Sequence, residues 1–115
     1  MKKILLTGCT LGLLLGAQVH ANEAALDGTL SKIANAKSIT LGYRDASVPF
    51  SYVGDSSGKP MGYSVDLASR IVERIQQKTG VANLNVQYNL VTSQTRIPLV
   101  QNGTVDLECG STGVT

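Results

Sequence analysis

Imidazole, thiol and aromatic side chains are scarce in this 115-residue sequence, which contains one histidine, two cysteines, one phenylalanine, four tyrosines and no tryptophan. The histidine, His20, lies in an N-terminal segment that has the features of a cleavable signal peptide. The mature chain would then contain no histidine, which excludes Ser–His and Cys–His catalysis and leaves no zinc cluster among these residues. The shortage of aromatic side chains also argues against a surface on which nucleic-acid bases stack.

The sequence also has no excess of positive or negative charge once the N-terminal segment is excluded. The whole chain carries a net charge of +2, for which Lys2 and Lys3 account. Residues 22–115 contain four Lys, four Arg, five Asp and three Glu and are therefore neutral, so a basic surface for nucleic acid is not supported. Cys109 is the only cysteine in this part. In an oxidising compartment it is either buried and inert or paired with a thiol outside these residues.

Residues 1–21 are predicted to be a signal peptide. Lys2 and Lys3 form a basic start, residues 4–19 are mostly apolar, and Ala21 ends a small-residue cleavage pattern. The apolar stretch is too short and too often broken by glycine for a membrane span. Cys9 offers an alternative, a lipoprotein processing site, but only about three strongly apolar residues precede it, fewer than a signal peptide normally has. We expect secretion into the periplasm in soluble form.

Residues 22–115 are enough for one small domain, but the sequence stops directly after a predicted strand and loop. We therefore interpret it as a fragment of a larger protein, or as half of a two-lobed domain. It contains neither a GxGxxG nor a GxxxxGK[ST] pattern, so a loop that cradles nucleotide phosphates has no support. No cofactor and no metal ion are expected.

Helical and extended patterns alternate along the chain, which predicts an α/β fold with a mainly parallel sheet and right-handed crossovers. Hydrophobic spacing and turn signals give the bounds of the elements. Helices are expected at residues 26–36, 64–79 and 96–101, strands at 39–42, 84–90 and 105–109, and a hairpin-like excursion between residues 50–53 and 61–63.

The same periodicity predicts which side chains are buried. The helix at 64–79 has one apolar stripe, which we interpret as core packing against the sheet rather than a partner-binding face. In the last strand, Asp106 and Glu108 alternate with apolar neighbours and are expected on the polar face of an edge-like strand. The stripe consists of Leu67, Ala68, Ile71, Val72 and Ile75.

Polar side chains follow the predicted strands at the positions where ligands settle in an open α/β sheet. A guanidinium flanked by hydroxyls and free backbone N–H groups suits a small carboxylate ligand. The alternative is that Ser93 or Thr95 merely caps the short helix and that Arg96 is a solvated surface charge. The candidates are, in chain order, Arg44, Ser93, Arg96, Ser111 and Thr112.

Three segments resemble bacterial extracellular solute-binding proteins of family 3. They are GYRDASVPFSY at residues 42–52, GYSVDL at 62–67 and TSQTRIPLVQNGTVDLECGST at 92–112. The resemblance extends over nearly all of residues 31–112. Within the family, these segments are similar to the subgroup that binds glutamate and aspartate in the periplasm for ABC importers.

The resemblance implies a two-lobed type II clamshell with the amino acid between its lobes. Residues 22–115 would be the first part of lobe one, ending near the first hinge. Gly113 stands where relatives usually have another threonine, which removes one hydroxyl contact. The groups that hold the ligand's ammonium are expected in the second lobe. An inner-membrane ABC permease is the implied partner of a monomeric protein, and the implied ligand contacts are Arg44, Ser93, Arg96, Ser111 and Thr112.

Charge complementarity agrees with this ligand. Glutamate and aspartate have two carboxylates, which two arginines complement, and serine and threonine hydroxyls would fill the remaining acceptor positions. Alternatives on the same fold are a binder of other polar amino acids, a periplasmic enzyme of the dehydratase type, and the sensor domain of a receptor. Asp45 and Asp66 lie 21 residues apart and give no sign of a paired acid/base site, so we do not expect an enzyme.

Overall fold

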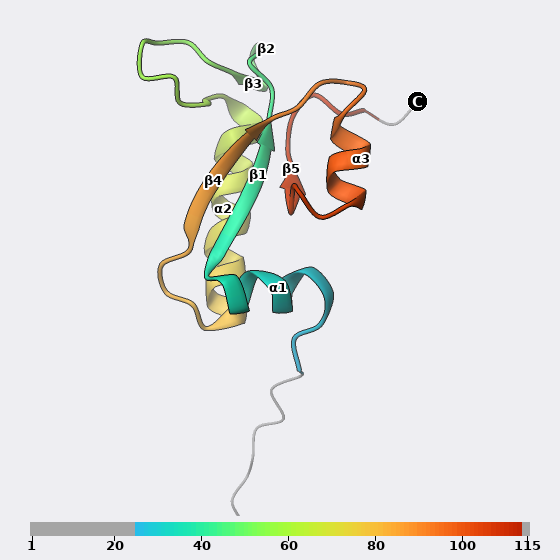
Figure 1. Ribbon diagram of the computed structural model, residues 1–115. Helices are drawn as coiled ribbons and strands as arrows, with labels where there is room; N and C mark the ends of the chain where they lie inside the picture. The colour runs from blue at the N-terminus through green and yellow to red at the C-terminus, as the bar shows by residue number, and fades with distance from the viewer. Residues whose placement is uncertain (1–24, 114–115) are drawn as a thin grey trace, which may run out of the picture.

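The computed structural model describes residues 25–113, in which helices and strands alternate (Figure 1). The predicted signal peptide and Cys9 lie outside the described residues. The elements are, in chain order, α1 (Gly28–Ala36), β1 (Ser38–Tyr43), β2 (Ala46–Ser47), β3 (Ser51–Tyr52), α2 (Tyr63–Thr79), β4 (Asn85–Leu90), α3 (Arg96–Gln101) and β5 (Leu107–Glu108).

A parallel sheet with the strand order β4-β1-β5 forms the centre of the described fold. β4 pairs with all six residues of β1, whereas β5 pairs with only two of them, with Gly42 opposite Glu108. The predicted α/β fold with a parallel sheet flanked by helices is confirmed. Since the strands are parallel, their carboxyl ends lie at one edge of the sheet.

A small antiparallel sheet, β2–β3, follows β1 at that edge. Ser47 pairs with Ser51, and Tyr52 forms an isolated bridge with Met61. The predicted pairing between residues 50–53 and 61–63 is therefore present. β2, at Ala46–Ser47, was not predicted from the sequence. A strand of two residues is too short to show the alternation from which strands are recognised in a sequence.

Backbone carbonyl groups hold the start of α2. Tyr63 N–H donates to Pro49 O at 3.0 Å, and Ser64 N–H donates to Phe50 O at 2.8 Å. Gly62 precedes the helix with a φ of 119°, and a Cβ atom there would lie 2.6 Å from Phe50 O. Only glycine fits this position without a shift of the backbone. α2 thus begins one residue before its earliest predicted start.

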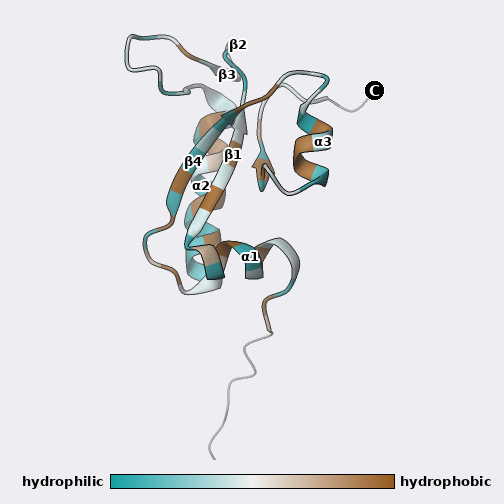
Figure 2. Cartoon of the chain, viewed as in Figure 1, coloured by the Kyte–Doolittle hydropathy of each residue, from teal (hydrophilic) through white to brown (hydrophobic). Residues whose placement is uncertain are grey.

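The hydrophobic core lies between β1, α2 and α1. Figure 2 shows hydrophobic and hydrophilic residues alternating along β1 and β4. β1 buries Ile39 and Leu41, whereas Tyr88 and Leu90 of β4 are exposed. This core is extended by five half-buried residues, Ile75, Val81, Val86, Leu107 and Cys109. Its buried members are Ile33, Ile39, Leu41, Ala68, Val72 and Leu84.

Part of the apolar stripe on α2 is not covered by the described residues. Leu67 and Ile71 are 41% and 39% exposed, so their prediction as core residues is wrong for this part of the chain. The described sheet ends at β5, a strand of two residues, and the described residues leave these two side chains partly uncovered. Together with Ile75 and Cys109 they line an apolar groove of about 400 Å³, bordered by Arg70, Arg74 and Lys78.

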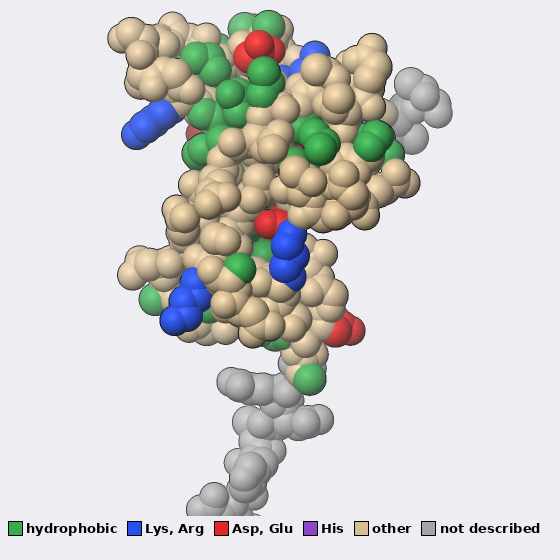
Figure 3. Space-filling view, viewed as in Figure 1, with side chains coloured by type: hydrophobic (Ala, Val, Ile, Leu, Met, Phe, Trp, Pro, Cys, Tyr) green, Lys and Arg blue, Asp and Glu red, His purple; other side chains and the backbone are tan. Residues whose placement is uncertain are grey.

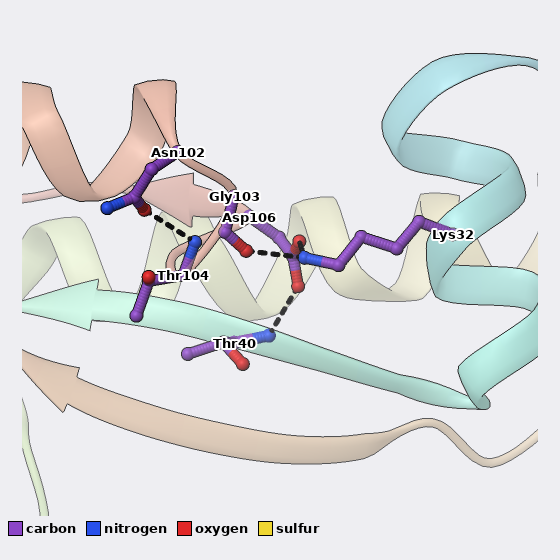
Figure 4. Close-up of polar contacts among 6 residues, drawn as sticks. All are labelled: Lys32, Thr40, Asn102, Gly103, Thr104 and Asp106. Carbon is purple, nitrogen blue, oxygen red and sulfur yellow. Dashed lines mark hydrogen bonds and ion pairs between the residues drawn. The ribbon is translucent and has the colours of Figure 1, made fainter.

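Asp106 connects three parts of the fold (Figure 4). Its Oδ2 accepts a hydrogen bond from Thr40 N–H at 2.9 Å, and its Oδ1 pairs with Lys32 Nζ at 2.7 Å. Lys32 also donates to Gly103 O. The Asp106 side chain is only 5% exposed, so its predicted place on a solvated strand face is wrong. The reason is that it takes the backbone N–H of β1 as its partner instead of water.

The surface of the described residues agrees with a neutral composition. On the face seen in Figure 3, Lys and Arg side chains are scattered and do not gather into a basic patch. None of the helices within residues 25–113 is long and apolar enough to cross a membrane.

Candidate functional site

The loops that follow β1, β4 and β5 lie at the carboxyl edge of the parallel sheet (Figure 1). Arg44 follows β1 directly, Ser93 follows β4, and Ser111 and Thr112 follow β5. Arg96 is the first residue of α3. Residues that lie up to 68 positions apart in the sequence are therefore carried by neighbouring loops. Their hydrogen bonds show which of them are brought into contact.

Arg44 is held through both its side chain and its backbone. Its Nη1 donates to Ser93 Oγ at 3.0 Å. Its backbone N–H donates to Ser51 Oγ at 2.8 Å, and the Ser51 hydroxyl donates to Arg44 O at 2.9 Å. Ser51 is fully buried. Sequence reasoning did not identify Ser51, because a single serine between two aromatic residues carries no pattern of its own.

The loop after β5 is attached to β2 and to α2. Ser111 Oγ donates to Ser47 Oγ at 3.2 Å, and Ser64 Oγ donates to Gly110 O at 2.8 Å. Ser64 is buried, whereas Ser111 is exposed. The buried hydroxyl thus fixes the loop backbone, whereas the Ser111 hydroxyl lies at the surface.

Thr112 is bonded to an acidic side chain. Its Oγ1 donates to Glu108 Oε2 at 2.7 Å. A carboxylate can only accept hydrogen bonds, so the hydroxyl proton of Thr112 points to Glu108. Glu108 was expected on a solvated strand face, but it is half-buried and its Oε1 atom is fully buried. The prediction is wrong because the Glu108 side chain is bonded to Thr112, which lies in the loop after β5.

Arg96 borders a hollow between α3 and β5 and is half-buried, so it is not a fully solvated surface charge. Its backbone N–H donates to Thr92 O at 3.1 Å. Among residues 25–113, no hydrogen bond or ion pair joins its guanidinium to another side chain. The hollow has a volume of about 330 Å³ and is lined by Arg96, Ile97, Val100, Gln101, Asp106, Leu107 and Glu108.

The turn before α3 is closed by two threonines. Thr92 N–H donates to Thr95 Oγ1 at 2.9 Å, and Thr95 N–H donates to Thr92 Oγ1 at 3.1 Å. The Thr95 side chain makes no capping hydrogen bond to α3, and Ser93 accepts from Arg44. The alternative in which either residue merely caps the helix therefore does not describe this structure.

Cys109 is a free, half-buried cysteine. Burial, together with the negative charge of Glu108, raises the pKa of its thiol above the ordinary value. A thiol of raised pKa is mostly protonated at neutral pH and is a weak nucleophile, which favours the inert alternative. Among residues 25–113, no three His, Cys, Asp or Glu side chains are grouped so that they could hold a metal ion.

Comparison with known proteins gives the family. A model described as bacterial extracellular solute-binding proteins, family 3, matches residues 39–115. The chain is 58% identical over 108 residues to the L-glutamate/L-aspartate-binding protein of Pseudomonas aeruginosa, covering 94% of this chain and 35% of that protein. It is 44% identical over 114 residues to the glutamate/aspartate import solute-binding protein of Salmonella typhimurium, covering 97% and 37%.

A solved structure has the same fold. The solute receptor for L-cysteine of Neisseria gonorrhoeae superposes with a TM-score of 0.63 at 26% identity, covering 76% of this chain and 34% of that one. The chain thus spans about a third of the length of the relatives that it matches. The resemblance seen in the three sequence segments and the fold described above agree with the family match, and the chain belongs to family 3 of the bacterial extracellular solute-binding proteins.

Proposed function

We propose that the chain is the first part of lobe one of a two-lobed type II clamshell that binds glutamate or aspartate between its lobes. Residues 1–21 would be the signal peptide and residues 22–115 the lobe-one part. The protein would be periplasmic and monomeric, and it would deliver its ligand to an inner-membrane ABC permease without acting as an enzyme. The similarity to the glutamate/aspartate-binding proteins of Pseudomonas aeruginosa and Salmonella typhimurium supports this proposal.

The observation that carries the proposal is the bond between Arg44 and Ser93 at the carboxyl edge of the sheet. It joins the loops after β1 and β4, so that the Arg44 guanidinium and the Ser93 hydroxyl lie together at this edge of the sheet. Arg44 keeps further donors for a carboxylate, since a guanidinium has five N–H groups and one of them is used by Ser93. The proposed ligand contacts are Arg44, Ser93, Arg96, Ser111 and Thr112.

Two guanidinium groups on separate loops suit a ligand with two separate carboxylates. Arg44 and Arg96 share no hydrogen-bond partner in the described residues, so each can receive its own carboxylate. A ligand amide in place of one carboxylate would leave one guanidinium poorly paired after the lobes exclude water. An uncompensated buried charge of this kind costs roughly 3–5 kcal/mol. The proposed site therefore distinguishes glutamate from glutamine by charge, not by size.

The ligand class can be tested by isothermal titration calorimetry. The protein used is the full-length, two-lobed protein of the proposal. L-glutamate and L-aspartate should bind, and L-glutamine should bind at least about a hundredfold more weakly. Equal affinity for glutamate and glutamine would mean a binder of polar amino acids in general.

Cell fractionation tests the compartment separately. The mature full-length protein should appear in the soluble periplasmic fraction. Recovery from the membrane fraction alone would instead support lipid attachment at Cys9.

A further inference from the structure

Asn102 and Gly103, at the end of α3, form the one Asn-Gly pair in the sequence. In such a pair the backbone nitrogen of the glycine can attack the side-chain carbonyl carbon of the asparagine, because glycine has no side chain to hinder the approach. The other five asparagines are followed by Glu, Ala, Leu, Val and Leu. Asn102 is exposed, so water reaches it. The pair therefore has the chemistry of a spontaneous deamidation site.

The reaction needs no partner other than water. Gly103 N forms a bond to Asn102 Cγ, and the bond from Cγ to Nδ2 breaks, so that the amide nitrogen leaves as ammonia with the proton of Gly103 N–H. Water then opens the cyclic imide at one of its two carbonyl carbons and gives aspartate or isoaspartate, with no electrons gained or lost. Aspartate adds a negative charge to the turn, and isoaspartate lengthens the backbone by one carbon.

The backbone at the end of α3 keeps the reacting atoms out of line. Ring closure requires Asn102 Cβ and Gly103 N to be eclipsed about the Cα–C bond. The ψ angle of Asn102 is −1°, so Gly103 N is eclipsed with Asn102 N instead, and Cβ is rotated away from it. Gly103 N–H also donates to Val100 O at 3.2 Å, which occupies the nucleophile. The attack therefore requires that this turn opens first.

Two side-chain contacts hold the turn in this form (Figure 4). Asn102 Oδ1 accepts a hydrogen bond from Thr104 N–H at 2.9 Å, so the amide that must rotate is itself fixed. Lys32 Nζ donates to Gly103 O at 2.5 Å and pairs with Asp106 at 2.7 Å. Lys32 belongs to α1 and lies 71 residues before Gly103, so this contact ties the turn to a distant part of the chain.

We propose that Asn102 is a deamidation site that the native turn protects, and that Lys32 holds this turn closed. The inference does not depend on the proposed function. The rate in the native protein is then set by local opening of the turn, since a local opening is more frequent than unfolding of the whole domain.

The test follows deamidation of Asn102 in the full-length protein at mildly alkaline pH, by mass spectrometry of the peptide that contains it. The wild type in urea gives the rate of the unfolded chain, and the native wild type should be at least about tenfold slower. Lys32→Ala should raise the native rate by about threefold to fivefold, because the turn loses a contact from an exposed lysine. Its rate in urea should equal that of the wild type, because Lys32 is distant from Asn102 in the sequence.

Two variants serve as controls. Lys32→Arg keeps a donor for Gly103 O and a charge for Asp106, so its native rate should stay near that of the wild type. Gly58→Ala destabilises the domain away from the turn and should raise the rate less than Lys32→Ala does. An equal rise in Gly58→Ala would overturn the inference, since Asn102 would then react only after global unfolding.

Two further results would also overturn it. A native wild type that deamidates as fast as the protein in urea would show that the turn gives no protection. A native rate in Lys32→Ala equal to that of the wild type would show that Lys32 does not hold the turn closed.

Discussion

Lys32 and Asp106 lie 74 residues apart in the sequence and form an ion pair of 2.7 Å in which the two side chains are 52% and 5% exposed. Asp106 also accepts from Thr40 N–H, and its own N–H donates to Thr40 O at 2.9 Å. The acidic partner is therefore bonded to the backbone of β1, whereas the basic partner lies at the surface. This asymmetry predicts that the two residues contribute unequally to stability.

Asp106→Ala should lower the free energy of unfolding by about 2–3 kcal/mol, because it leaves the part-buried backbone N–H of Thr40 without an acceptor. Lys32→Ala should cost about 1 kcal/mol or less, as is usual for an exposed partner. Chemical denaturation of both variants measures the difference. Equal losses would show that the ion pair, and not the bond to Thr40, carries the effect of Asp106.

Gly62 and Gly58 offer a matched pair of substitutions. Both have positive φ, 119° and 68°, but a Cβ on Gly62 would meet two backbone carbonyls whereas one on Gly58 would meet nothing within 4 Å. Gly58→Ala should cost about 1–2 kcal/mol, from the left-handed backbone alone. Gly62→Ala should cost at least about 3 kcal/mol, because the start of α2 must also move. Similar melting temperatures for the two variants would contradict the described start of α2.

Arg44 and Arg96 should each be required for binding of an acidic amino acid. Arg44→Ala and Arg96→Ala should raise the Kd for L-glutamate by at least about a hundredfold, since each leaves a ligand carboxylate without its guanidinium. Lysine should restore little, because it lacks the planar pair of donors. Titration calorimetry measures the effect. Normal glutamate binding by Arg44→Ala would refute the model of two arginines and would place Arg44 outside the site.

Residues 22–115 expressed alone should bind amino acids weakly or not at all and should self-associate. The exposed Leu67 and Ile71 border an apolar groove on α2, and the described residues do not cover it. Such a surface favours association. Replacing Leu67 and Ile71 by serine should lower the apparent mass in analytical ultracentrifugation. Glutamate binding in the micromolar range by residues 22–115 would show that the first part of the lobe is sufficient.

Cys109 should react slowly with iodoacetamide near neutral pH. Its raised pKa means that the reactive thiolate becomes the main form only above the pH at which an ordinary cysteine ionises. The alkylation rate should therefore still rise with pH where that of an unfolded control has levelled off. Glu108→Gln should move the profile towards lower pH, because one cause of the raised pKa is the charge of Glu108. Mass spectrometry of the labelled peptide measures the rates.

The elements that the sequence predicted well are those whose pattern arises from packing on one face. The helix at residues 96–101 has the predicted bounds, and the long helix begins one residue earlier than expected. A hydrophobic period of 3.6 or 2 residues indicates which face of a helix or strand packs against the core, and this information is contained in the local sequence. The order of these elements was also enough to predict a parallel sheet with its strand ends at one edge.

By itself, the sequence therefore determined the fold class, the positions of the main elements and the loops that carry the candidate residues. Only the tertiary structure decided how far Asp106, Glu108 and Leu67 are buried and which groups they contact. Asp106 and Glu108 alternate with apolar residues as a solvated strand face does, yet their partners Thr40 and Thr112 come from β1 and from the loop after β5. Leu67 has the spacing of a core residue, but it is 41% exposed because no other described residue covers it fully. Hydrogen bonding and burial depend on distance in space, which a periodic pattern along the chain does not contain.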